Sequence, residues 1–252
     1  MANIKKILEL LGTIAKEKKL STPFICGGLP RDKLLDNIEN IDDLDITTGD
    51  TSVHTLAQEF GRIIEPIGGH YLVLQDGHAQ VSFDGIKIDF SSHYIAPGVE
   101  ALLKKAGLKN PTSMLIEMIS RDFTVNSLLM TLDLKTIKDP TGLGINDIKK
   151  KRLRTCLPAN IALGNDNKRI IRVIYLAAKL GFAVDDEIKD WIIKNPAAIA
   201  NVKPKYLSKK LQQAINYNLE KTVELIDELG LWKYLPILPE LMPYATKSGR
   251  MI

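Results

Sequence analysis

The sequence is poor in cysteine and lacks a long apolar run, and each absence excludes a class of protein. Only Cys26 and Cys156 occur among the 252 residues, and their spacing fits no metal-ligand pattern. The sequence therefore supports neither a disulfide framework nor a structural zinc site, and a reducing cytoplasm is the expected location. No apolar run reaches the length of a membrane span and no cleavable signal pattern is found, so we expect no membrane association.

The excess of positive charge is also small. The 34 Lys and Arg residues exceed the 30 Asp and Glu residues by four, a mild preference for acidic partners that does not by itself indicate nucleic-acid binding. The hydrophobic fraction of 45% and the charged fraction of 25% are typical of a soluble globular protein. A chain of 252 residues can form one large domain or two ordinary ones.

An apolar run that ends in two glycines is the first feature with chemical content. Residues 24–35 predict a short strand, a tight turn and a helix that opens at Pro30. Gly27 and Gly28 let the backbone approach a ligand closely, and the free N–H groups at the start of the helix attract an anion. This stretch therefore predicts a phosphate-binding turn.

Paired carboxylates follow this turn. Asp43 and Asp45 occupy positions i and i+2 of a predicted strand, so both project from one face as metal ligands do. The strand-like runs 70–75, 78–83 and 86–91 are joined by Asp-Gly turns and predict an antiparallel meander. In the third run Asp89 lies on the polar face. If this strand lies beside that of Asp43 and Asp45, Asp89 becomes the third carboxylate of a metal site.

The chain changes character near residue 155, where the strand signals stop. We therefore predict an α+β fold, with a mainly antiparallel sheet in residues 1–154 and an all-helical region in residues 155–252. Residues 95–119 give the least clear pattern, and we expect this segment to be mobile. Helices are predicted at 3–19, 30–35, 51–62, 167–180, 185–194, 204–217, 219–229 and 233–242, with Asn165 as an N-cap and Gly181 as a C-terminal cap.

Four stretches occur in a characteristic order: Gly27–Asp32, Asp43–Thr48, Arg121–Leu128 and Asp166–Arg172. In order and approximate separation they resemble the motifs of the class II CCA-adding enzymes and bacterial poly(A) polymerases, in the polymerase β-like nucleotidyltransferase superfamily. Asp139–Gly142 also resembles a turn of that family. The resemblance implies that residues 1–154 form a catalytic nucleotidyltransferase head, and that residues 155–252 form a neck and body region for base selection and RNA contact.

The implied reaction is template-independent transfer of CMP and AMP from CTP and ATP to an RNA 3′-hydroxyl, with release of pyrophosphate. The resemblance favours the 3′ end of tRNA as the acceptor, with addition or repair of its CCA end. It implies that Asp43, Asp45 and Asp89 are catalytic residues that hold two Mg²⁺ ions. The implied nucleotide-binding residues are Gly27, Gly28, Arg31 and Asp32 at the triphosphate, Arg121, Asp122 and Asn126 at the sugar and phosphates, and Asp166, Arg169 and Arg172 at the base.

The sequence also departs from the family pattern. Asn165 stands where the family usually has an acid, while Ser120, Tyr175 and His93 stand at positions where arginines occur in family members. None of these differences affects the proposed metal ligands.

Other functions stay open: a poly(A) polymerase, a partial adder restricted to CC or A, a transferase that modifies another RNA or a protein, or an inactive RNA-binding module. The basic runs 149–154 and 203–210 are of a kind that most often forms solvated faces, although an RNA-binding enzyme could use either one.

Overall fold

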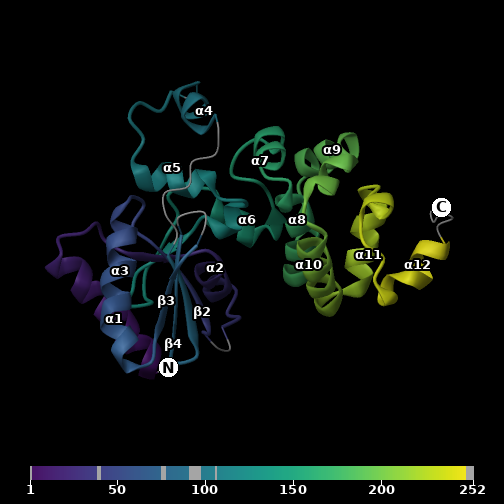
Figure 1. Cartoon of the computed structure of the whole chain (residues 1–252). Coiled ribbons are helices and arrows are strands. Elements are labelled where there is room, and N and C mark those ends of the chain that lie inside the picture. Colours follow the sequence, from purple (N-terminus) through teal and green to yellow (C-terminus); the bar gives the residue numbers. More distant parts are fainter. Residues whose placement is uncertain (1, 39–40, 75–77, 91–97, 106, 248–252) are drawn as a thin grey trace. The chain divides into compact units, whose positions relative to one another are not determined.

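A computed structural model describes the chain except for residues 1, 39–40, 75–77, 91–97, 106 and 248–252. The chain forms two compact units, Met1–Ile148 and Lys149–Ile252 (Figure 1). The boundary expected from the sequence, at residues 154–155, lies just inside the second unit.

A seven-stranded sheet forms the centre of the first unit. In spatial order its strands are β3 (His70–Val73), β4 (Ala79–Phe83), β5 (Ile86–Phe90), β2 (Asp43–Thr47), β1 (Phe24–Cys26), β6 (Leu129–Met130) and β7 (Ile137–Lys138). β2 and β5 pair in parallel, and the other neighbouring pairs of this sheet are antiparallel. The predicted α+β class with a mainly antiparallel sheet is therefore confirmed, and so is the β3–β4–β5 meander.

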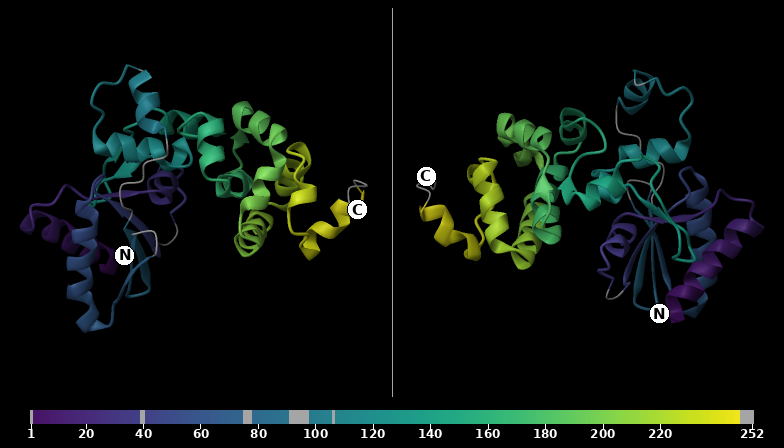
Figure 2. Two further views of the ribbon diagram at one scale, coloured as in Figure 1. Left: turned by 45° about the horizontal axis from the view of Figure 1, so that its top comes forward. Right: turned by 180° about the vertical axis from the view of Figure 1, so that it is seen from behind.

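Two helices of the first unit, α1 (Ala2–Glu17) and α3 (Ser52–Ile64), cover the apolar face of this sheet. The other helices of this unit are α2 (Gly28–Leu34), α4 (Val99–Lys105), α5 (Ser113–Ser120) and α6 (Gly144–Lys149), with short 3₁₀ turns at Glu65–Ile67 and Thr124–Asn126. α1 and α3 pack together, and both contribute to one core with β2 and β5 (Figure 2). Leu44, Ile46 and Ile88 are fully buried in this core. Because side chains alternate along a strand, the residues between them face the other way.

The second unit is built around α8. Its helices are α7 (Ala159–Asn165), α8 (Lys168–Leu180), α9 (Asp186–Lys194), α10 (Pro204–Tyr217), α11 (Leu219–Glu228) and α12 (Met242–Lys247), with 3₁₀ turns at Pro196–Asn201, Trp232–Tyr234 and Pro239–Leu241. α8 packs against α7, α10 and α11. Gly181 ends α8 with a φ of 66°, as the sequence predicts. None of the helices in the described ranges has the length and apolar character that a membrane crossing requires.

Several boundaries differ from those expected. α2 begins at Gly28 rather than at Pro30, because a proline is tolerated anywhere in the first turn, where its missing N–H has no helical partner. Asn165 is not an N-cap: it ends α7, and Asn167 occupies the N-cap position of α8 without a capping hydrogen bond from its side chain. No single helix spans 233–242, since Pro236 and Pro239 interrupt it and leave short 3₁₀ turns.

The structure also contains elements that the sequence did not indicate. β8 (Arg152–Leu153) and β9 (Ala183–Val184) form a parallel pair in the second unit, so that unit is not entirely helical. Two residues per strand are too few to give a periodic signal. In the segment 95–119, residues 95–97 and 106 lie outside the described residues, while α4 and α5 are helical. The mobility of this segment stays a prediction.

Candidate active site

The three acids Asp43, Asp45 and Asp89 lie on the polar face of the sheet. β2 and β5 pair so that Asp45 lies opposite Asp89 and Asp43 opposite Lys87. Paired residues of adjacent strands share a face, and Leu44 between the two acids is buried on the other one. The sequence left open whether these two strands are neighbours, and the structure shows that they are.

Gly27 brings the turn after β1 directly against Asp45. Its φ is 73°, a conformation that side chains other than glycine rarely adopt. A Cβ atom at this position would overlap the Asp45 carboxylate. At Gly28 a Cβ would lie 3.2 Å from Arg31 Nη2. Glycine is therefore required at position 27 both by the backbone conformation and by the space that Asp45 occupies, whereas at position 28 the Arg31 side chain leaves little room for a Cβ.

Lys87 lies among the three acids, although the sequence analysis did not single it out. Its Nζ forms an ion pair with Asp89 and lies 3.8 Å from Asp43 Oδ1. Gln80 Nε2, from β4, donates to Asp89 Oδ1 at 2.8 Å. Across the described parts of the chain, no three acidic, His or Cys side chains converge closely enough to hold an ion. The three carboxylates thus share a face without forming a closed cluster. Lys87 lies two residues before Asp89 in a predicted strand and therefore on the same face, and this spacing could have identified it from the sequence.

The electrostatics of this face suit a divalent cation. Burial, together with the negative charges of Asp43 and Asp89, raises the pKa of Asp45 to about 6, against the opposing charge of Arg121. Burial also raises the pKa of Asp43, against the charge of Lys87. Carboxylates crowded in this way repel one another, and a bound cation relieves that repulsion. Since Mg²⁺ prefers carboxylate oxygens as ligands, this set of residues fits the predicted metal.

A second polar network brings together four predicted nucleotide-binding residues. Arg31 is 3% exposed, and its Nη1 donates to Asn126 Oδ1 at 2.5 Å. Asp32 Oδ1 accepts from Arg31 Nε at 2.8 Å. Asn126 Nδ2 in turn donates to Asp122 Oδ1 at 3.1 Å. Arg31 and Asn126, which lie 95 positions apart in the sequence, are thereby joined into one network.

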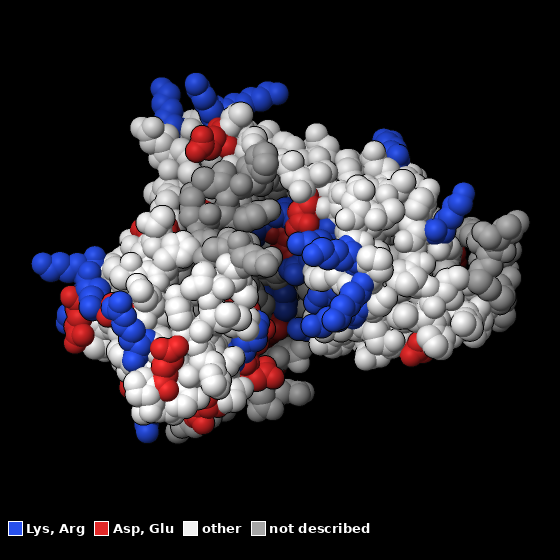
Figure 3. Space-filling view, in the orientation of Figure 1, with Lys and Arg blue, Asp and Glu red and all other residues white. Residues whose placement is uncertain are grey.

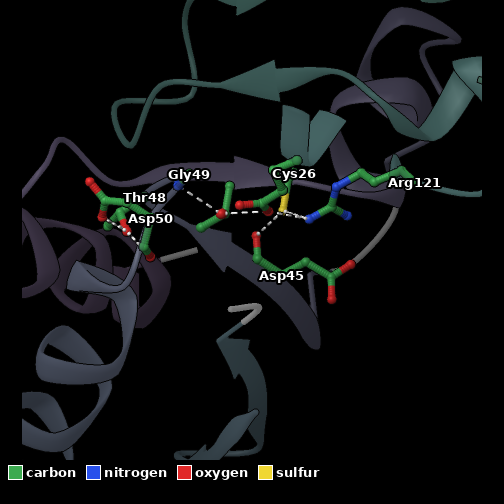
Figure 4. Close-up of polar contacts among 8 residues, drawn as sticks. Cys26, Asp45, Thr48, Gly49, Asp50 and Arg121 are labelled. Atoms are coloured by element: carbon green, nitrogen blue, oxygen red, sulfur yellow. Dashed lines mark hydrogen bonds and ion pairs between the residues drawn. The ribbon is translucent and has the colours of Figure 1, made fainter. Parts of the chain in front are cut away.

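Arg121 has different partners from those of Asp122 and Asn126. Its Nη2 donates to Cys26 Sγ at 2.9 Å and to Glu117 Oε1 at 3.1 Å. Figure 4 shows its guanidinium beside Cys26, whose Sγ also donates to the backbone oxygen of Asp45 at 3.5 Å. Arg121 therefore supplies a fixed positive charge near Asp45, rather than joining the Arg31 network.

Glu117 holds Arg121 in this position. It is 1% exposed and accepts from Thr47 Oγ1 at 2.6 Å, so α5 is bonded to β2 two residues beyond Asp45. Thr47 Oγ1 also accepts from Gly49 N at 3.0 Å. Glu117 is a residue that the sequence analysis missed. Glu117 lies four positions before Arg121 in an otherwise uncharged helix, and this spacing could have identified the ion pair from the sequence.

The end of β2 is tied to the start of α3 by Asp50 (Figure 4). Its carboxylate accepts from Ser21 Oγ at 2.5 Å, from Thr48 Oγ1 at 2.9 Å and from Ser52 N at 2.9 Å. Burial opposes ionisation, but these hydrogen bonds outweigh it and hold the pKa of Asp50 below its usual value.

The remaining predicted residues lie in the second unit. Asp166 precedes α8, and its Oδ1 accepts from Lys168 N at 3.1 Å. Asp166 Oδ2 lies 3.9 Å from Nε of Arg169, which is 4% exposed. Arg172 follows one turn later and is half-buried. The acceptor and the guanidinium of the predicted pair are therefore neighbours at the start of this helix.

Comparisons with known proteins agree on a family. The chain is 28% identical over 216 residues to a CCA-adding enzyme of Geobacillus sp. (strain WCH70), an alignment that covers 85% of this chain and 51% of the relative. Poly(A) polymerase I of Escherichia coli is 32% identical over 132 residues, 51% of this chain and 27% of the relative. The chain spans about half the length of the CCA-adding enzymes that it matches across most of its own length.

A solved structure shows the same fold. The CCA-adding enzyme of Bacillus stearothermophilus, in complex with CTP, aligns with a TM-score of 0.71 at 22% identity and covers 91% of this chain and 53% of that one. Residues 23–154 match the family model described as the poly(A) polymerase head domain. Because this match covers more than half of the sequence and includes β1 and the acid-bearing strands β2 and β5, the chain belongs to the poly(A) polymerase head domain family.

Proposed function

We propose that the protein transfers CMP and AMP from CTP and ATP to an RNA 3′-hydroxyl, and that its acceptor is the 3′ end of tRNA. The observation that carries this proposal is the placement of Asp43 and Asp45 on β2, with Asp89 opposite on β5 and the Gly27 turn against them. The relatives named CCA-adding enzymes, one of them solved with CTP, support the substrate class. The low cysteine content motivates a cytoplasmic location as part of the same proposal.

The three acids would be the catalytic residues and would hold two Mg²⁺ ions. When bound, such ions lower the pKa of the attacking hydroxyl and stabilise charge on the leaving pyrophosphate. The chain itself contributes the arrangement of the carboxylates. The register between β2 and β5 fixes Asp45 opposite Asp89, and Arg121 balances part of the negative charge at Asp45. Because strand pairing holds these carboxylates in place, little reorganisation would be needed when the substrate binds.

The Arg31 network would bind the nucleotide. Gly27 and Gly28 keep the turn free of side chains beside Asp45, which allows a triphosphate to approach the backbone. Arg31 with Asp32 would lie at the phosphates, and Asp122 with Asn126 would accept and donate at the ribose hydroxyls. A carboxylate left unpaired by a missing hydroxyl is costly, so this pair would favour ribonucleotides.

The second unit would select the base. Asp166 and Arg169 together offer an acceptor and a donor fork that can pair with a base edge, and Arg172 adds a further donor one turn later. This division assigns catalysis to the residues up to 154 and base selection with RNA contact to residues 155–252.

The experiment is an incorporation assay on the purified protein with Mg²⁺. Each labelled triphosphate is supplied in turn with tRNA transcripts that lack one, two or three nucleotides of the CCA end. We expect ordered addition of C, C and A, followed by termination. An absence of transfer to every transcript would refute the proposed acceptor.

A poly(A) polymerase is the second candidate, because the chain is 32% identical to poly(A) polymerase I of Escherichia coli over 132 residues. Long A tails formed from ATP alone in the same assay would establish this function. Addition of only CC or only A would identify a partial adder.

A further inference from the structure

The two central helices of the second unit carry charge of one sign. α8 contains Lys168, Arg169, Arg172 and Lys179, and α10 contains Lys205, Lys209 and Lys210, while neither helix contains an Asp or a Glu. The two helices pack side by side. Figure 3 shows Lys and Arg side chains gathered over the region of α8 and α10 in the view of Figure 1. Their shared surface is therefore suited to a polyanion.

Two tyrosines lie on this surface between lysines. The rings of Tyr175, on α8, and Tyr217, on α10, meet edge to face, with their centroids 6.0 Å apart and an interplanar angle of 62°. Lys210 Nζ lies 4.3 Å from the Tyr175 centroid, and Lys179 Nζ lies 5.8 Å from that of Tyr217. Tyr217 is 54% exposed, so part of its ring is open to a ligand. We call these four residues the tyrosine–lysine face.

Further residues lie on the same side of each helix as the tyrosine–lysine face. On α8 the sequence positions 172, 175 and 179 recur every three or four residues, as do 206, 210, 213 and 217 on α10, so each set lies on one side of its helix. Lys210 Nζ donates to Gln213 Oε1 at 2.9 Å on the same side of α10. Glu240 accepts from Gln212, about half a turn away from Lys210 around the helix. The packed helix α11 carries four acids, Glu220, Glu224, Asp227 and Glu228. Three of them have partners away from this face: Glu224 pairs with Lys221, Glu228 pairs with Lys189, and Asp227 accepts from Trp232.

We propose that the tyrosine–lysine face binds single-stranded RNA, with a base stacked on Tyr217 and phosphates beside Lys179 and Lys210. This assignment rests on the proposed function, whose substrate ends in an unpaired RNA strand. Aromatic rings stack on bases of any sequence, and lysines neutralise the phosphates between them. Surfaces that combine the two features bind single strands, because a base within a duplex is already stacked and paired.

The test measures the affinity of the full chain for a fluorescein-labelled, 12-nucleotide single-stranded RNA at several salt concentrations. Tyr217→Leu should raise the Kd roughly 5- to 100-fold, since it removes one stacking platform, whereas Tyr217→Phe should stay close to wild type. The double variant Lys179→Gln/Lys210→Gln should reduce the slope of log K against log salt by about 1.4, which corresponds to two phosphate contacts. Lys194→Gln/Lys233→Gln, at two exposed lysines of the same unit, is the matched charge control and should leave the slope unchanged.

Three results would overturn the assignment: wild-type affinity in Tyr217→Leu, an equal change of slope in Lys194→Gln/Lys233→Gln, or a blunt duplex RNA that binds as well and loses as much affinity in the same variants. Incorporation by the wild-type protein is measured separately. If the variants lose RNA affinity but the wild type adds no nucleotide, the proposed function fails while the RNA face stands. If the wild type adds nucleotides and the variants bind normally, the face alone is refuted.

Discussion

Replacement of Glu117 by Gln tests whether the bond between α5 and β2 holds the acidic strand in its active arrangement. Glu117 lies between Thr47 of β2 and Arg121, and Arg121 is the positive charge that most opposes the raised pKa of Asp45. Glutamine has nearly the same shape but no charge, so Glu117→Gln removes the ion pair while an oxygen stays available to Thr47. The variant therefore separates the charge from the packing.

The magnitude follows from the burial of the pair. The Glu117 side chain is 1% exposed and that of Arg121 is 17% exposed. Removal of one partner from a buried pair costs about 3–5 kcal/mol. We expect the lower end of that range, because the bond to Thr47 survives. For a unit of this size the Tm should fall by roughly 6–12 °C. The kcat for CMP incorporation should fall roughly tenfold or more, since Arg121 would no longer be fixed beside Asp45.

The assays are thermal unfolding and single-nucleotide incorporation at a temperature where the variant is folded. Glu9→Gln is the control in the same unit: the Lys5–Glu9 contact is 3.9 Å long with both side chains mostly exposed, so its loss should change stability by less than about 0.5 kcal/mol. If Glu117→Gln kept both the wild-type Tm and the wild-type kcat, the proposed role of this ion pair would be wrong.

Three further substitutions test other parts of the site. Gly27→Ala should abolish incorporation, because the alanine Cβ would overlap the Asp45 carboxylate. Gly85→Ala is the control: Gly85 has a similar φ of 75°, but an added Cβ there would meet no atom within 4 Å. This control should show the backbone cost of about 1–2 kcal/mol and keep its activity. Asp45→Asn should eliminate incorporation while the Kd for RNA stays near wild type, and transfer at the wild-type rate would exclude the proposed metal site. Asp50→Asn should be less stable than wild type in urea at pH 7. The folded-state pKa of Asp50 is lowered, so its contribution is complete above the ordinary pKa near 3.8 and is lost as the pH falls through the lower, folded-state value. The two unfolding curves should therefore converge in strong acid, and a gap that stays constant with pH would contradict this account.

The parts of the fold that could be predicted are those whose signals are local. The Asp84-Gly85 turn has positive φ at both residues, as a two-residue hairpin requires, and the alternation of Ile86, Ile88 and Phe90 correctly placed Asp89 on the polar face. α7 and the pair β8–β9 could not be predicted, because short elements are held by tertiary packing rather than by their own periodicity. Glu117 was overlooked because its hydrogen-bond partner, Thr47, lies 70 residues earlier in the chain, and no local pattern links the two residues.

The position of the acids depends on core residues that take no part in the chemistry. β2 alternates Asp43, Leu44, Asp45 and Ile46, and only the register in which Leu44 and Ile46 enter the core brings Asp45 opposite Asp89. A slip of one residue would bury both carboxylates and expose both apolar side chains, which would cost several kcal/mol for the carboxylates alone. The apolar pattern thus selects one register, and that register places the three acids on one face. A mutation that weakened this preference, even at a buried position such as Ile88, would therefore be expected to disturb the candidate active site as well as the stability of the sheet.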